Sequence, residues 1–146
     1  MKMNETCENC LFFRQTGFRP SGKFRVFNSY DEMKKAWKGT KYFREDHFGY
    51  VYICQFGTNV KIGQTKEPLT RISTHEQNLR IYGNNVIGKI ALTRDFPFYK
   101  ELEDFLHKKF SEYSVQREVF NISFERAVDA LTELLCEPFF GYLYSL

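Results

Sequence analysis

The clearest pattern of apolar and polar positions lies in residues 50–63, which read as two short strands joined by a glycine-containing turn. Side chains alternate between the two faces of a strand, so Tyr52 shares a face with Cys54. A turn centred on residues 56–57 would place Tyr52 directly across from Lys61. This hairpin therefore predicts a phenol and an ammonium group within contact distance.

Two helices are predicted downstream of the hairpin. Pro68 suits the first turn of a helix, because a missing N–H costs nothing there. Arg71 and His75 then lie one turn apart on one helix face. An apolar run at residues 86–93 predicts a third strand, and Pro97 opens a second helix. The inward stripe of that helix is predicted to contain Leu102, Phe105, Leu106, Phe110 and Tyr113, with Glu103 and His107 beside it.

These elements predict a small α/β (α+β) domain over residues 49–146. Its sheet would have three strands, mainly antiparallel, with helices packed around it. A last helix would follow a cap at Asn121 or Ser123.

Residues 1–48 form an extension in front of this domain. They carry 10 Lys/Arg against 6 Asp/Glu, so the extension is basic. Residues 24–27 are predicted as a strand, and Ser29-Tyr-Asp-Glu32 has the form of a capping box that starts a short helix. Arginines and lysines alternate with phenylalanines at the start of the extension, which suits either contact with nucleic acid or a basic rim over buried rings.

Ordered short motifs run through residues 49–122, half of the chain. They are Tyr50-Val51-Tyr52, Lys61-Ile62-Gly63, Arg71, Glu103 in Glu103-x-x-Leu106-His107, and Glu118-Val119-Phe120-Asn121. In this order and spacing they resemble the GIY-YIG endonuclease superfamily, in the phage-type branch that has Lys-Ile-Gly as its second half-motif. The chain departs from the family's name in two places: Tyr50 replaces the first glycine, and Lys61 replaces the second tyrosine.

The resemblance implies a divalent-metal-dependent endonuclease that hydrolyses DNA phosphodiester bonds, of phage or mobile-element origin. Arg71 would hold phosphate oxygens with its planar guanidinium, because negative charge develops on them during attack by water. Glu103 would be the metal ligand for Mg²⁺ or Mn²⁺, since hard cations prefer carboxylate oxygen. His75, one turn from Arg71, is a candidate to orient these groups, and the alternative is a solvated or structurally paired histidine.

Tyr52 is the candidate general base or water-orienting group. An ordinary phenol has a pKa near 10 and is about one part in a thousand ionised at neutral pH. Neighbouring positive charge favours the phenolate, so Lys61, Arg71 and a metal ion are expected to lower the pKa of Tyr52. Lys61 would act in this way or contact the phosphate itself.

A second interpretation is a catalytically inactive module that binds nucleic acid or a protein partner as a regulator. Lys61 in place of tyrosine favours it, as does the apolar tail over residues 137–146, which could meet a partner or a second copy. DNA is the expected ligand of the enzyme, with RNA the alternative.

Composition favours a folded protein of the cytoplasm, which would be the host's if a phage encodes the chain. The chain is 42% hydrophobic, yet it contains no apolar run of transmembrane length, so no membrane association is expected. Its four cysteines are then expected as thiols. Cys7 and Cys10 have the spacing of half a zinc site, but without a second close pair, two thiols are favoured over structural zinc.

Overall fold

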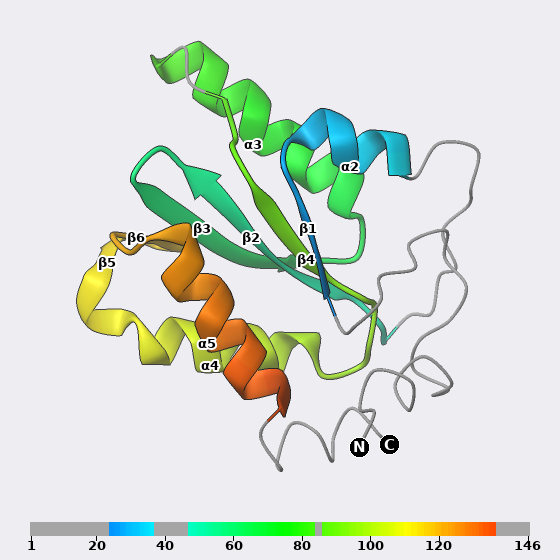
Figure 1. Ribbon diagram of the computed structural model, residues 1–146, viewed down its shortest axis with the longest axis vertical. Coiled ribbons are helices and arrows are strands. Elements are labelled where there is room, and N and C mark those ends of the chain that lie inside the picture. The colour runs from blue at the N-terminus through cyan, green and yellow to red at the C-terminus, as the bar shows by residue number, and fades with distance from the viewer. Residues whose placement is uncertain (1–23, 37–46, 84–85, 137–146) are drawn as a thin grey trace.

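The computed structural model describes residues 24–36, 47–83 and 86–136 (Figure 1). Its strands are β1 (Phe24–Phe27), β2 (Tyr50–Phe56), β3 (Asn59–Thr65), β4 (Ile90–Thr93), β5 (Ser114–Gln116) and β6 (Val119–Phe120). Its helices are α2 (Tyr30–Ala36), α3 (Pro68–Gly83), α4 (Tyr99–Lys109) and α5 (Phe124–Cys136), with a short 3-10 turn at Ser111–Tyr113. Strands and helices therefore mix along the chain, as the α/β prediction requires.

The strands form one six-stranded sheet in the order β1-β4-β2-β3-β6-β5, and all its neighbouring strands run antiparallel. The three predicted strands are its centre, β4-β2-β3. The prediction of three strands is wrong at both edges, because β1 adds to β4 and the small β5–β6 hairpin adds to β3. All three residues of β5 are exposed and β6 has two residues, so neither strand leaves an alternating pattern in the sequence.

The predicted register of the β2–β3 hairpin is also wrong. The two turn residues are Gly57 and Thr58, and Gly57 has a φ of 61°, which glycine adopts without strain. Tyr52 consequently pairs with Gly63 rather than with Lys61. The shift is two residues, which is one full side-chain period, so Tyr52 and Lys61 still share a face of the sheet.

The sheet is covered by helices on both faces (Figure 1). One core lies under α4 and α5 and contains Val51, Ile53 and Ile62. The other lies under α2 and α3 and contains Tyr52. Because β2 is buried on both faces from Tyr50 to Cys54, it forms the centre of both cores.

Helix α4 buries the stripe Leu102, Leu106 and Phe110 but leaves Phe105 44% exposed, contrary to the prediction for Phe105. Successive residues of a helix turn by about 100°, so Phe105 lies to one side of the direction that the other three share. Helix α5 begins after Ser123, whose Oγ accepts a hydrogen bond of 3.1 Å from the backbone N–H of Arg126. Of the two predicted caps, Ser123 is therefore the one used.

The strand and helix predicted in the extension are both present. Ser29 Oγ accepts a hydrogen bond of 3.1 Å from the Glu32 N–H, and the Glu32 carboxylate accepts one from the Asn28 N–H, which is a capping arrangement at the start of α2. Cys7, Cys10, the basic stretch before Phe24 and the tail over residues 137–146 lie outside the described residues. Within the described part of the chain, no helix is long and apolar enough to cross a membrane.

Candidate functional site

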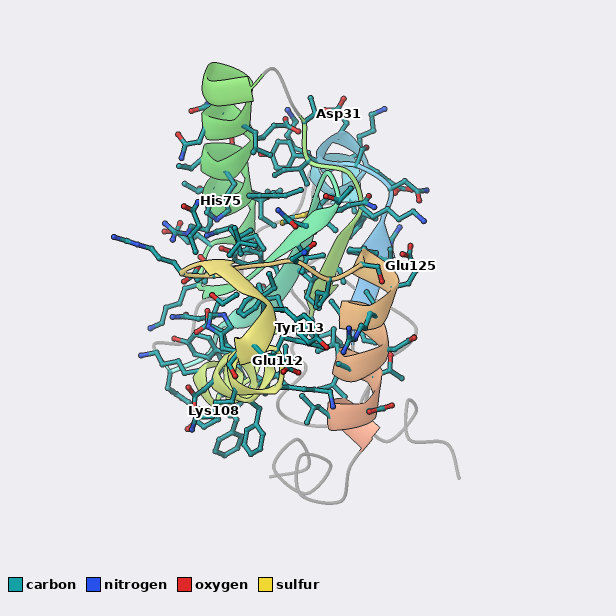
Figure 2. The ribbon with its side chains drawn as sticks, turned by 90° about the vertical axis from the view of Figure 1, so that its left-hand side faces the viewer. Asp31, His75, Lys108, Glu112, Tyr113 and Glu125 are labelled. Atoms are coloured by element: carbon teal, nitrogen blue, oxygen red, sulfur yellow. The ribbon has the colours of Figure 1, made fainter. Side chains whose placement is uncertain are left out.

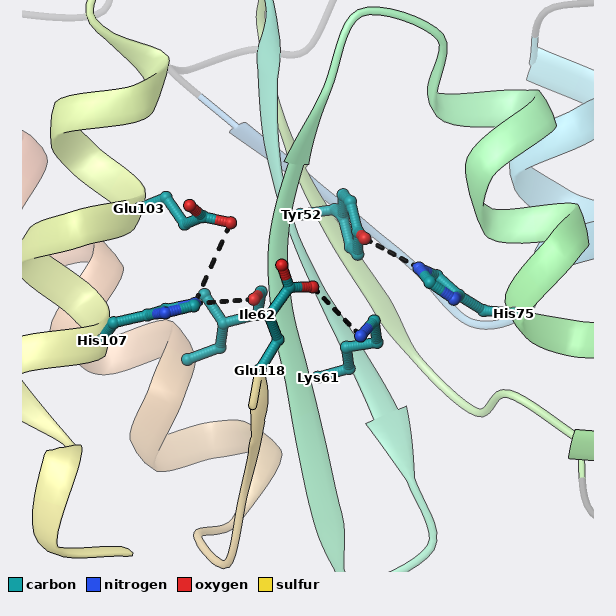
Figure 3. Close-up of polar contacts among 7 residues, drawn as sticks. All are labelled: Tyr52, Lys61, Ile62, His75, Glu103, His107 and Glu118. Atoms are coloured by element: carbon teal, nitrogen blue, oxygen red, sulfur yellow. Dashed lines mark hydrogen bonds and ion pairs between the residues drawn. The ribbon is translucent and has the colours of Figure 1, made fainter. Parts of the chain in front are cut away.

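Tyr52 lies in the middle of β2 and is fully buried. Its hydroxyl oxygen lies 2.8 Å from Nε2 of His75, which α3 places over the same face of the sheet (Figure 3). A Cβ atom on Gly63, directly opposite on β3, would come within 2.6 Å of the ring carbon Cζ of Tyr52. The glycine that ends Lys-Ile-Gly therefore leaves room for this phenol.

Burial sets the protonation of this pair. Burial raises the pKa of Tyr52 well above its ordinary value, and the hydrogen bond and charge of Arg71 only partly oppose this. Burial also lowers the pKa of His75, and with the charges of Lys61 and Arg71, which act in the same direction, it brings this pKa to about 4. At neutral pH the phenol keeps its proton and the imidazole is neutral. Arg71 lowers the pKa of Tyr52 as expected, but the pKa rises overall, because desolvation outweighs this cation.

Lys61 is occupied by an acidic partner. Its Nζ lies 3.0 Å from Oε1 of Glu118, and the two side chains are 14% and 33% exposed. The contact is an ion pair without the geometry of a directional hydrogen bond. Glu118 stands just before β6, which pairs with β3 at Lys61 itself. Its negative charge raises the pKa of Tyr52 and so further opposes formation of the phenolate.

Glu103 and His107 approach from α4, one turn apart. His107 Nε2 lies 2.8 Å from the backbone oxygen of Ile62 and 3.9 Å from Glu103 Oε2 (Figure 3). That carboxylate oxygen is buried and has no hydrogen-bond partner among the described residues. Burial raises the pKa of Glu103, His107 opposes the rise, and Glu118 adds to it.

The predicted site residues come from both faces of the sheet. Tyr52, Lys61, Arg71 and His75 belong to the face under α3, and Arg71 is exposed there. Glu103 belongs to α4 on the other face. Figure 3 shows Glu103 and Tyr52 on the two sides of β3, with Lys61 on the side of Tyr52 and the Glu118 carboxylate at the strand between the two sides.

The outer edge of β3 lies between the side chains on the α3 face and Glu103 on the α4 face. Strand β6 pairs with β3 only at Val60 and Lys61, so beyond Ile62 the outer edge of β3 has no strand partner in the described chain. Glu118 raises the pKa values of both Tyr52 and Glu103, and Lys61 lowers that of Glu103. Lys61 and Glu118 thus link Glu103 electrostatically to the cluster on the face that carries Tyr52, although Glu103 itself belongs to the other face.

Sequence reasoning missed Glu118 as a member of this cluster and placed it only in the segment that closes the domain. It follows Arg117, whose φ of 41° marks a tight turn, and that turn aims Glu118 back at β3. The signal available in the sequence was an acidic residue between a turn and the apolar pair Val119-Phe120, which is too common to identify a site by itself.

Three comparisons with known proteins bear on this cluster. Residues 49–135 match the family described as the T5orf172 domain, which covers more than half of the chain and includes β2 through most of α5. No match was found among curated proteins or among solved structures.

Proposed function

We propose that this chain, which belongs to the T5orf172 domain family, is a metal-dependent endonuclease that hydrolyses DNA phosphodiester bonds. Domains of this family are found in nucleases of phages and mobile elements, which supports a DNA-related function. More specifically, we propose that the catalytic site of the chain is of the GIY-YIG type. The support is the set Tyr52, Lys61, Arg71, His75 and Glu103. The first four belong to one face of the sheet, and Lys61 and Glu118 link them electrostatically to Glu103 on the other face.

The observation that carries the proposal is the buried oxygen Oε2 of Glu103. A carboxylate oxygen that is buried without a hydrogen bond is costly, and a cation would relieve that cost. Glu103 would hold Mg²⁺ or Mn²⁺, with substrate phosphate and water completing the shell, since no group of three or more His, Cys, Asp or Glu residues in the described chain could hold a metal. When bound, the ion would supply Lewis-acid stabilisation of the charge that develops on the phosphate.

The side chains under α3 would bind and orient. Arg71 is exposed and hydrogen-bonds Tyr52, so the guanidinium donors that this bond does not use would bind non-bridging phosphate oxygens. Glu118 would keep the Lys61 ammonium in one place at the side of the phosphate. Preorganised charges of this kind stabilise a transition state without rearrangement during the reaction.

For Tyr52 to orient the attacking water, substrate binding would have to admit a water to its buried hydroxyl, which is hydrogen-bonded to His75. A free phenolate is disfavoured here, because burial raises the pKa of Tyr52. The neutral imidazole of His75 can instead accept the phenol proton at Nε2 while the phenol oxygen takes a proton from water. The pair would then move a proton without a free phenolate on the way.

The burial of Tyr52 also favours a second candidate function. Its side chain is fully buried, so its oxygen does not meet solvent in this structure. A site that keeps the fold but excludes water would suit a catalytically inactive nucleic-acid- or protein-binding regulatory module.

Plasmid nicking distinguishes the two candidates. We would incubate supercoiled plasmid with the protein and Mg²⁺, Mn²⁺ or EDTA, comparing wild type with Glu103→Gln. Glu101→Gln is the matched control, because Glu101 lies on the same helix and is exposed. Wild type and Glu101→Gln should nick only with metal, and Glu103→Gln should be at least roughly a hundredfold slower, because it loses the metal anchor.

Two other outcomes would contradict this proposal. Plasmid binding without nicking under every metal condition would show the inactive module. Metal-dependent nicking that Glu103→Gln leaves intact would refute the role given to Glu103. Running the same assay on RNA would separate a DNA enzyme from an RNA enzyme.

A further inference from the structure

An open groove of about 520 Å³ lies next to the proposed catalytic cluster. Its walls come from three places: the tip of the β2–β3 hairpin, α3, and the β5–β6 hairpin. Figure 2 faces the side of the molecule on which His75 and the β5–β6 hairpin come together. Its volume falls in the range of small-molecule sites, roughly 300–1,000 Å³.

The groove and the catalytic cluster share side chains. Lys61 and His75 line the groove, and the same Lys61 pairs with Glu118 while the same His75 contacts the Tyr52 hydroxyl. A phosphodiester held at the cluster would therefore place one of its attached nucleosides at the mouth of this groove.

The lining of the groove has the chemistry of a base-binding site. Three carboxamides converge on it, one from each wall: Asn59, Asn78 and Gln116. Each carboxamide offers a donor and an acceptor, which is the pairing that the edges of nucleobases present. The lining also contains apolar and aromatic side chains, at Phe56, Leu79, Val115 and Val119.

The few charges in the lining of the groove also favour a base over a second phosphate. Lys61 is the only lysine or arginine among the lining residues, and no aspartate or glutamate is among them. A second phosphate would find few cations deep in the groove, whereas an uncharged planar ring with polar edges suits its carboxamides and its aromatic side chains.

We propose that this groove binds the unpaired base of the nucleotide next to the scissile phosphate. The preferred substrate would then be a nucleic acid with an unpaired nucleotide at the cut. This inference rests on the proposed function, because the phosphate is placed by the catalytic cluster. In a duplex the pairing edge of a base is already hydrogen-bonded to the partner strand, so a duplex would have to release the base before the carboxamides could bind that edge.

The test compares one helix residue with its neighbour. Asn78→Ala removes a carboxamide from the groove, and Gln77→Ala removes an exposed carboxamide of α3 that does not line it. The substrates are a DNA duplex with one unpaired nucleotide beside a defined phosphate, and the same duplex with an abasic site at that nucleotide. Both are cleaved with Mg²⁺ or Mn²⁺.

Asn78→Ala should lower kcat/KM about tenfold on the substrate that has the base, the usual size for a lost hydrogen bond of this kind. On the abasic substrate, wild type and Asn78→Ala should be equal, because there is no base to lose. Gln77→Ala should match wild type on both. An equal loss on both substrates, or no loss on either, would overturn the groove as a base site.

A binding measurement separates this inference from the proposed function. The unpaired nucleotide is replaced by 2-aminopurine, whose fluorescence reports the surroundings of the base without any cleavage. If wild type cuts nothing yet changes this fluorescence, and Asn78→Ala loses the change, hydrolysis is wrong and the base site stands. If wild type cuts DNA but leaves the fluorescence unaltered, the base site is wrong and the nuclease stands.

Discussion

Tyr52 and His75 show how burial fixes the chemistry of single residues in this protein. In water the imidazole would change its charge near pH 6.5 and the phenol near pH 10. In the fold, burial keeps the proton on the phenol to higher pH and keeps the imidazole neutral to lower pH. Their hydrogen bond of 2.8 Å is compatible with those neutral forms. Gly63 belongs to the same arrangement, because only a residue without a Cβ atom lets the ring lie against β3.

The lowered pKa of His75 predicts a pH dependence of stability. The pKa is about 4 in the fold against an ordinary 6.5, so between those values the unfolded chain binds a proton that the folded chain does not. The contribution is therefore complete above about pH 6.5 and is lost as the pH falls toward 4. From pH 7 to pH 5 the wild type should lose roughly 2 kcal/mol of unfolding free energy through His75.

Urea unfolding at the two pH values measures this effect. His75→Gln should show a smaller loss between pH 7 and pH 5 than wild type, because the titrating group is gone. His47→Gln is the control, because that histidine is exposed. An equal pH dependence in wild type and His75→Gln would show that His75 titrates normally.

At the scale of elements, α4 joins the core to the site. Its buried stripe, Leu102, Leu106 and Phe110, fixes the rotation of the helix against the sheet. That rotation aims Glu103 and His107 at the edge of β3, where His107 reaches the backbone oxygen of Ile62. Packing on one side of the helix thus determines where the proposed metal ligand points.

Two adjacent positions of α4 test this orientation. Leu106 is fully buried, so Leu106→Ala should cost about 2–5 kcal/mol of unfolding free energy. Phe105 is 44% exposed, and Phe105→Ala should cost roughly 1 kcal/mol or less, although it removes more atoms. Denaturant unfolding measures both, and a reversed order would mean that the helix is rotated relative to this structure.

On the scale of the whole molecule, the sheet extends beyond the residues that match the family. Strand β1 pairs with β4 along all four of its residues, and α2 lies against α3. Phe27 and Met33 from this segment are fully buried in the same core as Tyr52. The part of the extension that the structure describes therefore completes the core behind the site.

Because β1 and α2 share a core with the rest of the sheet, we expect one cooperative unfolding transition. Phe27→Ala should cost about 3–5 kcal/mol and lower the Tm seen by far-UV and near-UV circular dichroism together. Val26→Ala, at a neighbouring position that is 41% exposed, should change little. If Phe27→Ala left the Tm at the wild-type value, β1 would not contribute to the core in solution.

Features that depend on neighbours along the chain could be predicted from the sequence. Alternation predicted β2 and β3, a proline and helical spacing predicted α3 with Arg71 and His75 on it, and the capping residues predicted where α2 and α5 begin. These signals are local, because the period of an element and the capping of its ends involve residues a few positions apart.

Only the tertiary structure decided how those parts meet. The β5–β6 hairpin is too short to carry a period, and its Glu118 reaches Lys61, 57 positions earlier in the chain, only because β6 pairs with β3. The pKa of Tyr52 rises rather than falls, because desolvation depends on every segment packed around the phenol and not on its nearest charges alone. Likewise, the side of the sheet from which Glu103 arrives is set by the packing of α4, which spacing along the chain does not specify.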